Sequence, residues 1–205
     1  MPKKKIQGDQ LIKDAVPQIR IKYKDIFDLN EFYKALREWF NDKQWVDEED
    51  KNEHWETYYG ERLAGGSREI WWWWRLFKKA PDSDYLKYYI DIDVHCLGIV
   101  DTEVIVNGNK LKVNKGEIDF YMKGMIEKTY EAEFEKNWLL REVKDIFSRR
   151  IYRKNLEQRR KELYQEMYEL NNFIKQWLKL KRYLPYEEAP DFFSSYAWPS
   201  HLKEK

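Results

Sequence analysis

The hydrophobic pattern of the first fifth of the chain predicts a strand followed by an amphipathic helix. Apolar and basic side chains alternate over residues 19–27, which is typical of a half-buried strand with a basic outer face. Asp28 stands three residues before Glu31, a spacing that caps a helix N-terminus. Apolar residues then recur every three or four positions, so we expect a helix over residues 28–43. Its apolar stripe consists of Leu29, Phe32, Tyr33, Leu36, Trp39 and Phe40.

Alternation with a period of two governs the centre of the chain and predicts an antiparallel meander. Residues 70–77 have the composition of a strand, and residues 85–97 alternate more cleanly, with apolar side chains at the even positions. Asn107 and Gly108 then separate two apolar runs, and this dipeptide favours the tight turn of a β-hairpin. A further strand is expected over residues 118–126, with apolar residues on one face.

Beyond residue 136 the period becomes helical, and no proline occurs before Pro185. A continuous helix over residues 136–184 would be roughly 70 Å long at about 1.5 Å per residue, which is more than a domain of this size can cover. We therefore expect the helix to break near residues 148–155 or to project from the domain. The sequence after Pro185 mixes proline, acidic and aromatic residues without a period and predicts an irregular segment docked by its aromatic side chains.

These elements predict an α+β fold, in which an antiparallel β-meander is packed by an N-terminal helix and a long C-terminal amphipathic helix. The order of elements resembles the helix-grip arrangement of START-like lipid- and ligand-binding domains, although no sequence motif carries the resemblance. It implies a curved sheet that wraps a terminal helix. We divide the chain into a basic leader (1–18), an α+β domain (19–147), a basic amphipathic helical extension (148–184) and an aromatic tail (185–205).

Composition narrows the class of protein without assigning a function. The 205 residues carry 38 Lys and Arg against 37 Asp and Glu, so any electrostatic function must come from local segregation of charge. Aromatic residues make up 17% of the chain, which argues for a folded core. The single cysteine, Cys96, excludes an internal disulfide. Because we find neither a signal peptide nor an apolar run of about 18 residues, we expect a soluble, cytoplasmic protein.

The strongest functional signal is a basic segment over residues 149–161, which has seven cations and one acid, Glu157. Guanidinium groups match the geometry of phosphate, so RNA, DNA or an anionic lipid headgroup could dock there. The alternative is that these cations pair with the acidic segment over residues 47–56. The cations are Arg149, Arg150, Arg153, Lys154, Arg159, Arg160 and Lys161.

The distal part of the same helix is a candidate for helix–helix interaction, because its apolar residues follow heptad-like spacing. It could contact a protein partner or a second copy of the chain, or it could pack back on its own domain. The residues concerned are Leu163, Met167, Leu170, Ile174 and Trp177.

Four consecutive tryptophans, at positions 71–74, are the most unusual feature of the sequence. A strand presents two of them to each face, and the core needs only one pair. Trp71 and Trp73 therefore require a cover, which could be another part of the chain, a partner or a ligand.

Asp91, Asp93 and His95 alternate along one strand, so their side chains share a face and could hold a divalent metal ion. The alternative is ion pairing with the nearby cations Arg75 and Lys87. No second cluster of histidine or cysteine is found in the sequence to complete a metal site.

The sequence contains no recognisable catalytic motif, and Cys96 faces the predicted core, where a thiol is inert. We expect a non-enzymatic binding or assembly protein, without a cofactor, whose basic C-terminal helix contacts a partner, RNA and lipid headgroups being the anionic candidates. One alternative is a carrier of a small hydrophobic ligand in a helix-grip cavity lined by Trp72, Trp74, Tyr88 and Phe120. The other is a metal-dependent enzyme that uses Asp91, Asp93 and His95.

Overall fold

The structure is a computed structural model, and it describes residues 11–47, 55–81, 85–106, 109–130, 134 and 152–179. It confirms the predicted α+β class. The elements are, in chain order, β1 (Leu11–Phe27), α1 (Leu29–Asp42), β2 (Val46–Asp47), β3 (Glu56–Ala64), β4 (Ser67–Lys79), β5 (Leu86–Val106), β6 (Asn109–Lys128) and α4 (Arg153–Trp177).

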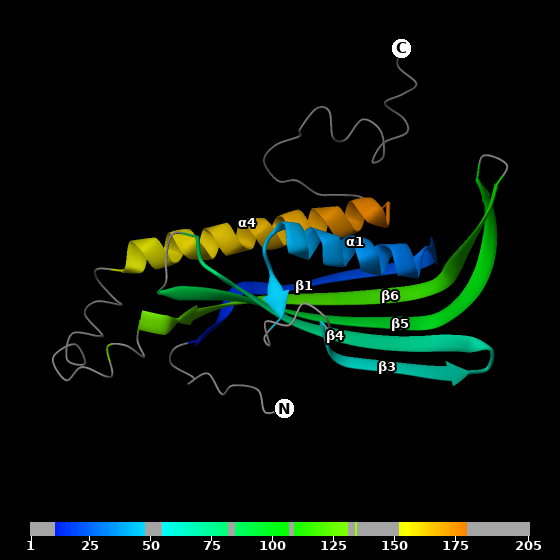
Figure 1. Cartoon of the computed structure of the whole chain (residues 1–205), viewed down its shortest axis with the longest axis horizontal. Coiled ribbons are helices and arrows are strands. Elements are labelled where there is room, and N and C mark those ends of the chain that lie inside the picture. Colours follow the sequence, from blue (N-terminus) through cyan, green and yellow to red (C-terminus); the bar gives the residue numbers. More distant parts are fainter. Residues whose placement is uncertain are drawn as a thin grey trace, which may run out of the picture.

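The strands form one antiparallel sheet in the order β1-β6-β5-β4-β2, with β3 also paired to β4. The first strand therefore lies beside the last one. Both helices lie over the same face of the curved sheet (Figure 1). We call this the helix-side face, and the opposite one the outer face. None of the helices that the structure describes is long and apolar enough to cross a membrane.

The core lies between the helix-side face and the two helices. The apolar positions predicted for β5 all point into it, as do those of β4, and each of these side chains is at most 5% exposed. α1 contributes its predicted stripe, because Phe32, Leu36 and Phe40 are fully buried. The buried residues of the two central strands are Ile70, Trp72, Trp74, Leu76, Leu86, Tyr88, Ile90, Ile92, Val94 and Cys96.

The predicted cap of α1 is present. The backbone N–H of Glu31 donates to Oδ1 of Asp28, at 3.0 Å, so one of the unpaired donors of the first turn is satisfied. The backbone N–H of Leu29 donates to Oδ1 of Asn114 on β6, at 3.2 Å. The start of the helix is thus tied both to its own cap and to the sheet.

α4 begins after Tyr152, and residues 135–151 lie outside the described part of the chain, so the structure does not say whether the helix continues from residue 136. From Arg153 onward the helix lies against β1 and β6. A methyl group at Gly124 of β6 would overlap the sulfur of Met167, so the close approach of the helix to the sheet requires a glycine there.

β5 and β6 extend past their neighbours and form a two-stranded arm, residues 100–106 and 109–113, that bends towards the side of the helices (Figure 1). Gly98, whose φ is 64°, adds a residue to β5 at a bulge. The bulge inverts the alternation, so Asp101 and Glu103 take the helix-side face and Val100 takes the outer one. The predicted hairpin is confirmed by the pairing of Val106 with Asn109, although the turn residues lie outside the described chain.

Candidate binding surface

Of the five cations of the basic segment that the structure describes, three contact the protein's own groups. Arg153 donates to Glu157 at 3.1 Å, and Arg159 donates to Glu162 at 2.8 Å. Arg160 donates through Nε to the backbone oxygen of Ala15 on β1, at 2.7 Å. Arg159 and Arg160 are therefore engaged within the fold, which narrows the site expected from the sequence, whereas Arg153 stays largely exposed beside Glu157.

The remaining members of the basic segment divide into two groups. Lys154 and Lys161 are exposed on α4, whereas Arg149 and Arg150 lie outside the described residues. Most of the acidic segment, residues 48–54, also lies outside them, so its pairing with the arginines is not described.

The heptad-like apolar residues of α4 belong to the core of this chain. Leu163, Met167, Leu170 and Ile174 are fully buried. Trp177 is partly exposed, and its ring centroid lies 6.3 Å from that of Phe32 on α1. Of the two possibilities left open by the sequence, packing back on its own domain is the one observed.

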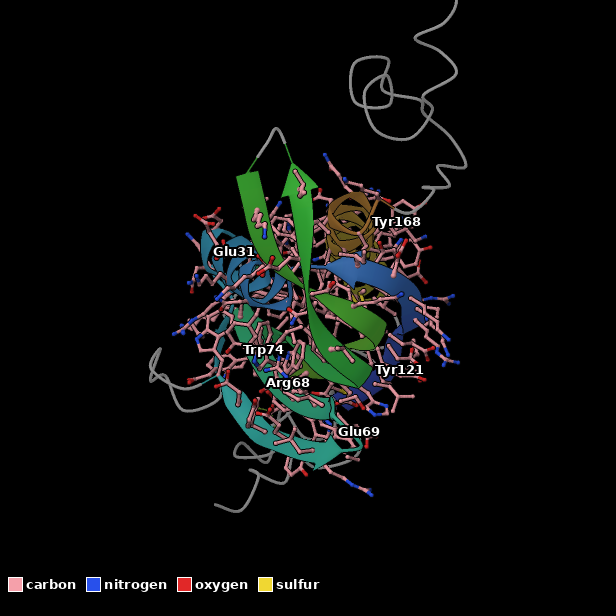
Figure 2. The ribbon with its side chains drawn as sticks, turned by 90° about the vertical axis from the view of Figure 1, so that its right-hand side faces the viewer. Glu31, Arg68, Glu69, Trp74, Tyr121 and Tyr168 are labelled. Atoms are coloured by element: carbon pink, nitrogen blue, oxygen red, sulfur yellow. The ribbon has the colours of Figure 1, made fainter. Side chains whose placement is uncertain are left out.

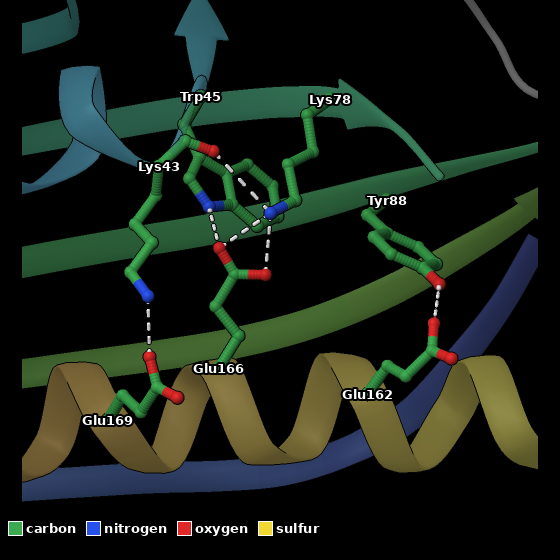
Figure 3. Close-up of polar contacts among 7 residues, drawn as sticks. All are labelled: Lys43, Trp45, Lys78, Tyr88, Glu162, Glu166 and Glu169. Carbon is green, nitrogen blue, oxygen red and sulfur yellow. Dashed lines mark hydrogen bonds and ion pairs between the residues drawn. The ribbon is translucent and has the colours of Figure 1, made fainter. Parts of the chain in front are cut away.

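A cluster of polar contacts fastens α4 to the sheet and to the segment that follows α1 (Figure 3). Nζ of Lys78 on β4 lies 2.6 Å from both carboxylate oxygens of Glu166 on α4, and Nε1 of Trp45 donates to the same carboxylate at 2.8 Å. One turn further, Lys43 donates to Glu169 at 2.7 Å. These contacts make the helix an integral part of the domain.

The predicted metal-site residues are engaged in ion pairs or in a hydrogen-bond contact. The guanidinium of Arg75 lies 3.5 Å from Asp91 and 2.6 Å from Asp93. Nε2 of His95 lies 2.9 Å from a carboxylate oxygen of Glu69. Among the described residues no group of three or more metal-ligand side chains comes together, so the arrangement fits ion pairing, the alternative to a metal site.

The aromatic residues expected to line a ligand cavity are buried in the core. Trp72, Trp74, Tyr88 and Phe120 are at most 2% exposed. Two hollows, of about 490 and 360 Å³, lie beside the start of α1 and beside β2, and neither is lined by any of the four. Cys96 is buried as predicted, and burial raises the pKa of its thiol.

The outer face carries a row of side chains that spans five strands. The pairing register places Tyr58 of β3 beside Trp73 of β4, Trp73 beside Asp93 of β5, Asp93 beside Tyr121 of β6, and Tyr121 beside Arg20 of β1. Residues opposite each other in neighbouring strands share a face. Figure 2 shows Tyr121 on this face and Trp74 on the side of α1.

The tryptophans of the outer face are covered in part by side chains of neighbouring strands. Trp73 and Tyr58 pack with ring centroids 4.4 Å apart, and Trp71 stacks on His95 at 5.2 Å with nearly parallel rings. The Tyr58 ring lies over Gly60, where a Cβ atom would come within 2.8 Å of the tyrosine hydroxyl. Trp73 and Tyr58 nevertheless remain 39% and 44% exposed.

The polar groups beside Tyr121, at the β1 end of the row, are held in place by one another. The guanidinium of Arg20 forms an ion pair with Asp119 and lies over the ring of Tyr121, 5.0 Å from its centroid. The hydroxyl of Tyr121 donates to Asp119 at 3.1 Å. The hydrogen bond from Arg20 keeps the pKa of Asp119 below its usual range, so this carboxylate is ionised at neutral pH.

Trp71 and Trp73 of this surface were predicted from the sequence, whereas Tyr58, Tyr121 and Arg20 were not. The alternation of apolar and basic residues in β1 does place Arg20 on the outer face. The neighbours of Arg20 on other strands could not be predicted, because alternation gives no information on how strands pair.

Comparison with models of known protein families, with curated proteins and with solved structures found no match to this chain.

Proposed function

We propose that this chain is a non-enzymatic binding protein that receives its ligand on the outer face of the sheet. The observation that carries the proposal is the accessible Trp73–Tyr58 pair, which stands on the face opposite both described helices. Exposed aromatic rings that neighbouring residues hold in fixed positions are typical of recognition surfaces, because they contribute a large contact area with little loss of side-chain freedom on binding.

Three side chains with shifted pKa values are poorly placed for proton transfer near neutral pH. A group that transfers protons near neutral pH has a pKa close to 7. The pKa of Asp119 is instead lowered by its hydrogen bond from Arg20, whereas burial raises those of Cys96 and Tyr88. None of these groups is therefore suited to act as a general acid or base at neutral pH.

The exposed side of α4 is the competing surface, and it would suit an anionic partner. Lys154 and Lys161 are exposed there, and the side chain of Arg153 is 72% exposed despite its contact with Glu157. Binding of an anionic partner such as RNA or a lipid headgroup, which was expected from the sequence, therefore remains a second proposal, and it can be tested together with the first.

A pair of double variants separates the two surfaces. Trp73→Ala/Tyr58→Ala removes the aromatic pair, whereas Lys154→Glu/Lys161→Glu reverses two charges on α4. Each protein is tested by calorimetry and co-sedimentation against neutral oligosaccharides, oligouridylate and vesicles that contain phosphatidylserine. We expect the aromatic variant to lose binding and the charge variant to keep it. The opposite result would assign binding to α4 and refute the proposal.

A further inference from the structure

We infer that the ligand of the outer face is an uncharged carbohydrate chain that lies across the strands along the row from Tyr58 to Arg20. This inference rests on the function proposed above and adds the chemical class of the ligand. Three features of the outer face lead to it: the spacing of its aromatic rings, the balance of its charges and the fixed positions of its polar groups.

The aromatic rings are arranged for a ligand made of repeated rings. Trp73 and Tyr121 stand two strands apart, which is about 10 Å, and Asp93 lies between them in the row. Tyr58 adds its ring beside Trp73. A pyranose ring presents a flat patch of C–H groups that packs on an aromatic ring, and its hydroxyl groups point sideways. A chain of such rings can therefore pack on the exposed Trp73–Tyr58 pair and extend past Asp93 to Tyr121, over whose ring the Arg20 guanidinium already lies.

The charges of the row cancel locally. Arg75 is paired with Asp93, and Arg20 with Asp119. The β1 edge of the sheet is more basic than the row, because two lysines, Lys22 and Lys24, share the single carboxylate of Glu117, at 2.5 and 4.0 Å. A phosphate backbone that crossed the row would pass over Asp93, whose side chain is 49% exposed, and would gain little from arginines that already have partners. The row is therefore better matched to a neutral ligand.

The polar groups are ordered before any ligand binds. Arg75 donates to the backbone oxygen of Ile92 at 3.0 Å as well as to Asp93 at 2.6 Å, which fixes the guanidinium plane. Tyr121 is held by its hydrogen bond to Asp119. Hydroxyl groups both donate and accept hydrogen bonds, so the carboxylate of Asp93, which is half exposed and held in a fixed position by Arg75, can accept from them.

The test measures binding of the full chain to neutral hexasaccharides of glucose, mannose, xylose and N-acetylglucosamine by isothermal titration calorimetry, with oligouridylate as the competing probe. Trp73→Ala is the test variant. Trp177→Ala is its matched control, because both side chains are 39% exposed and Trp177 stands on α4. We expect at least one hexasaccharide to bind, Trp73→Ala to weaken it about tenfold or more, and Trp177→Ala to leave it unchanged.

Two further measurements distinguish carbohydrate from nucleic acid. Raising the salt concentration leaves carbohydrate binding unchanged and weakens RNA binding steeply. Asp93→Asn removes a negative charge from the row, so it would strengthen RNA binding, whereas it weakens carbohydrate binding because an amide is a poorer acceptor than a carboxylate.

The outcomes separate this inference from the proposed function. Binding of oligouridylate that depends on Trp73, without binding of any hexasaccharide, would overturn the carbohydrate inference and leave the proposed surface intact. Binding of a hexasaccharide that Trp73→Ala and Trp177→Ala affect equally would overturn both. Failure of every probe to bind would also overturn the carbohydrate inference.

Discussion

Lys78 of β4 and Glu166 of α4 form an ion pair that is largely shielded from water, with side chains only 15% and 14% exposed. The ammonium also lies over the ring of Trp45, 4.9 Å from its centroid. The pair joins the last helix to a central strand. The contact therefore helps to define where the helix lies on the sheet.

Removing the carboxylate is expected to destabilise the fold. Glu166→Gln leaves the Lys78 ammonium partly buried beside a neutral amide, which costs about 3 kcal/mol of unfolding free energy. Urea denaturation at neutral pH measures the change. The control is Glu169→Gln, since its pair with Lys43 is 57% and 41% exposed and its loss costs less than about 1 kcal/mol. Equal losses for the two variants would show that burial of the first pair has no energetic effect.

The approach of α4 to β6 predicts strong coupling between two residues. Gly124→Ala places a methyl group against the sulfur of Met167, so the helix must shift, at a cost of about 1–3 kcal/mol. Met167→Ala alone opens a cavity, at a cost of about 2–5 kcal/mol. In the double variant the new methyl group occupies part of that cavity, so the combined loss is smaller than the sum by about 1 kcal/mol or more. Strict additivity in chemical denaturation would contradict this packing.

Burial of Cys96 predicts a loss of stability in alkali. Because burial raises the pKa of this thiol, the folded protein keeps a proton that the unfolded chain releases above about pH 8.5. Above that pH the unfolded state binds fewer protons, so the free energy of unfolding falls as the pH rises. Cys96→Ala is expected to flatten the decline between neutral pH and pH 10. Identical slopes for the two proteins in urea titrations would show that the thiol makes no contribution.

The stability of the fold at acidic pH depends on carboxylates such as Asp119. Its pKa is lowered in the folded state, chiefly by the hydrogen bond from Arg20, so it stabilises the fold above its unfolded pKa of about 3.9 and loses this effect as the pH falls. Asp119→Asn should therefore lower stability at pH 7 and flatten the decline below pH 4. Because Arg20 is half exposed, we expect a loss of less than about 1 kcal/mol. A larger gap at low pH than at pH 7 would contradict this sign.

Local signals in the sequence predicted much of the fold. The cap of α1 depends on two residues that are three positions apart, and the buried face of β5 follows from a strict alternation of apolar and polar residues. Both could therefore be predicted from residues that are close in sequence. The pattern expected for β5 ended at residue 97, where the bulge at Gly98 changes which positions face the core.

The candidate surface was harder to predict because its contacts join distant parts of the chain. Arg20 and Asp119 are 99 residues apart in sequence, and Arg160 is 145 residues from the carbonyl it contacts. Seven cations in thirteen residues indicate a basic helix face, but they do not show which of them the fold uses internally. Helical spacing likewise revealed an apolar stripe on α4 without showing that β1 and β6 would cover it.

The alternating burial of the four tryptophans affects how the register between β4 and β5 is determined. If β4 slipped by one residue against β5, the tryptophans would exchange faces, and the core would still receive two indole rings. The run alone therefore tolerates two alignments. The flanking residues remove the ambiguity, because the slip would bury Arg75 and turn Leu76 towards water. Arg75 and Leu76, which follow the four tryptophans, thus determine which of the two alignments the chain adopts.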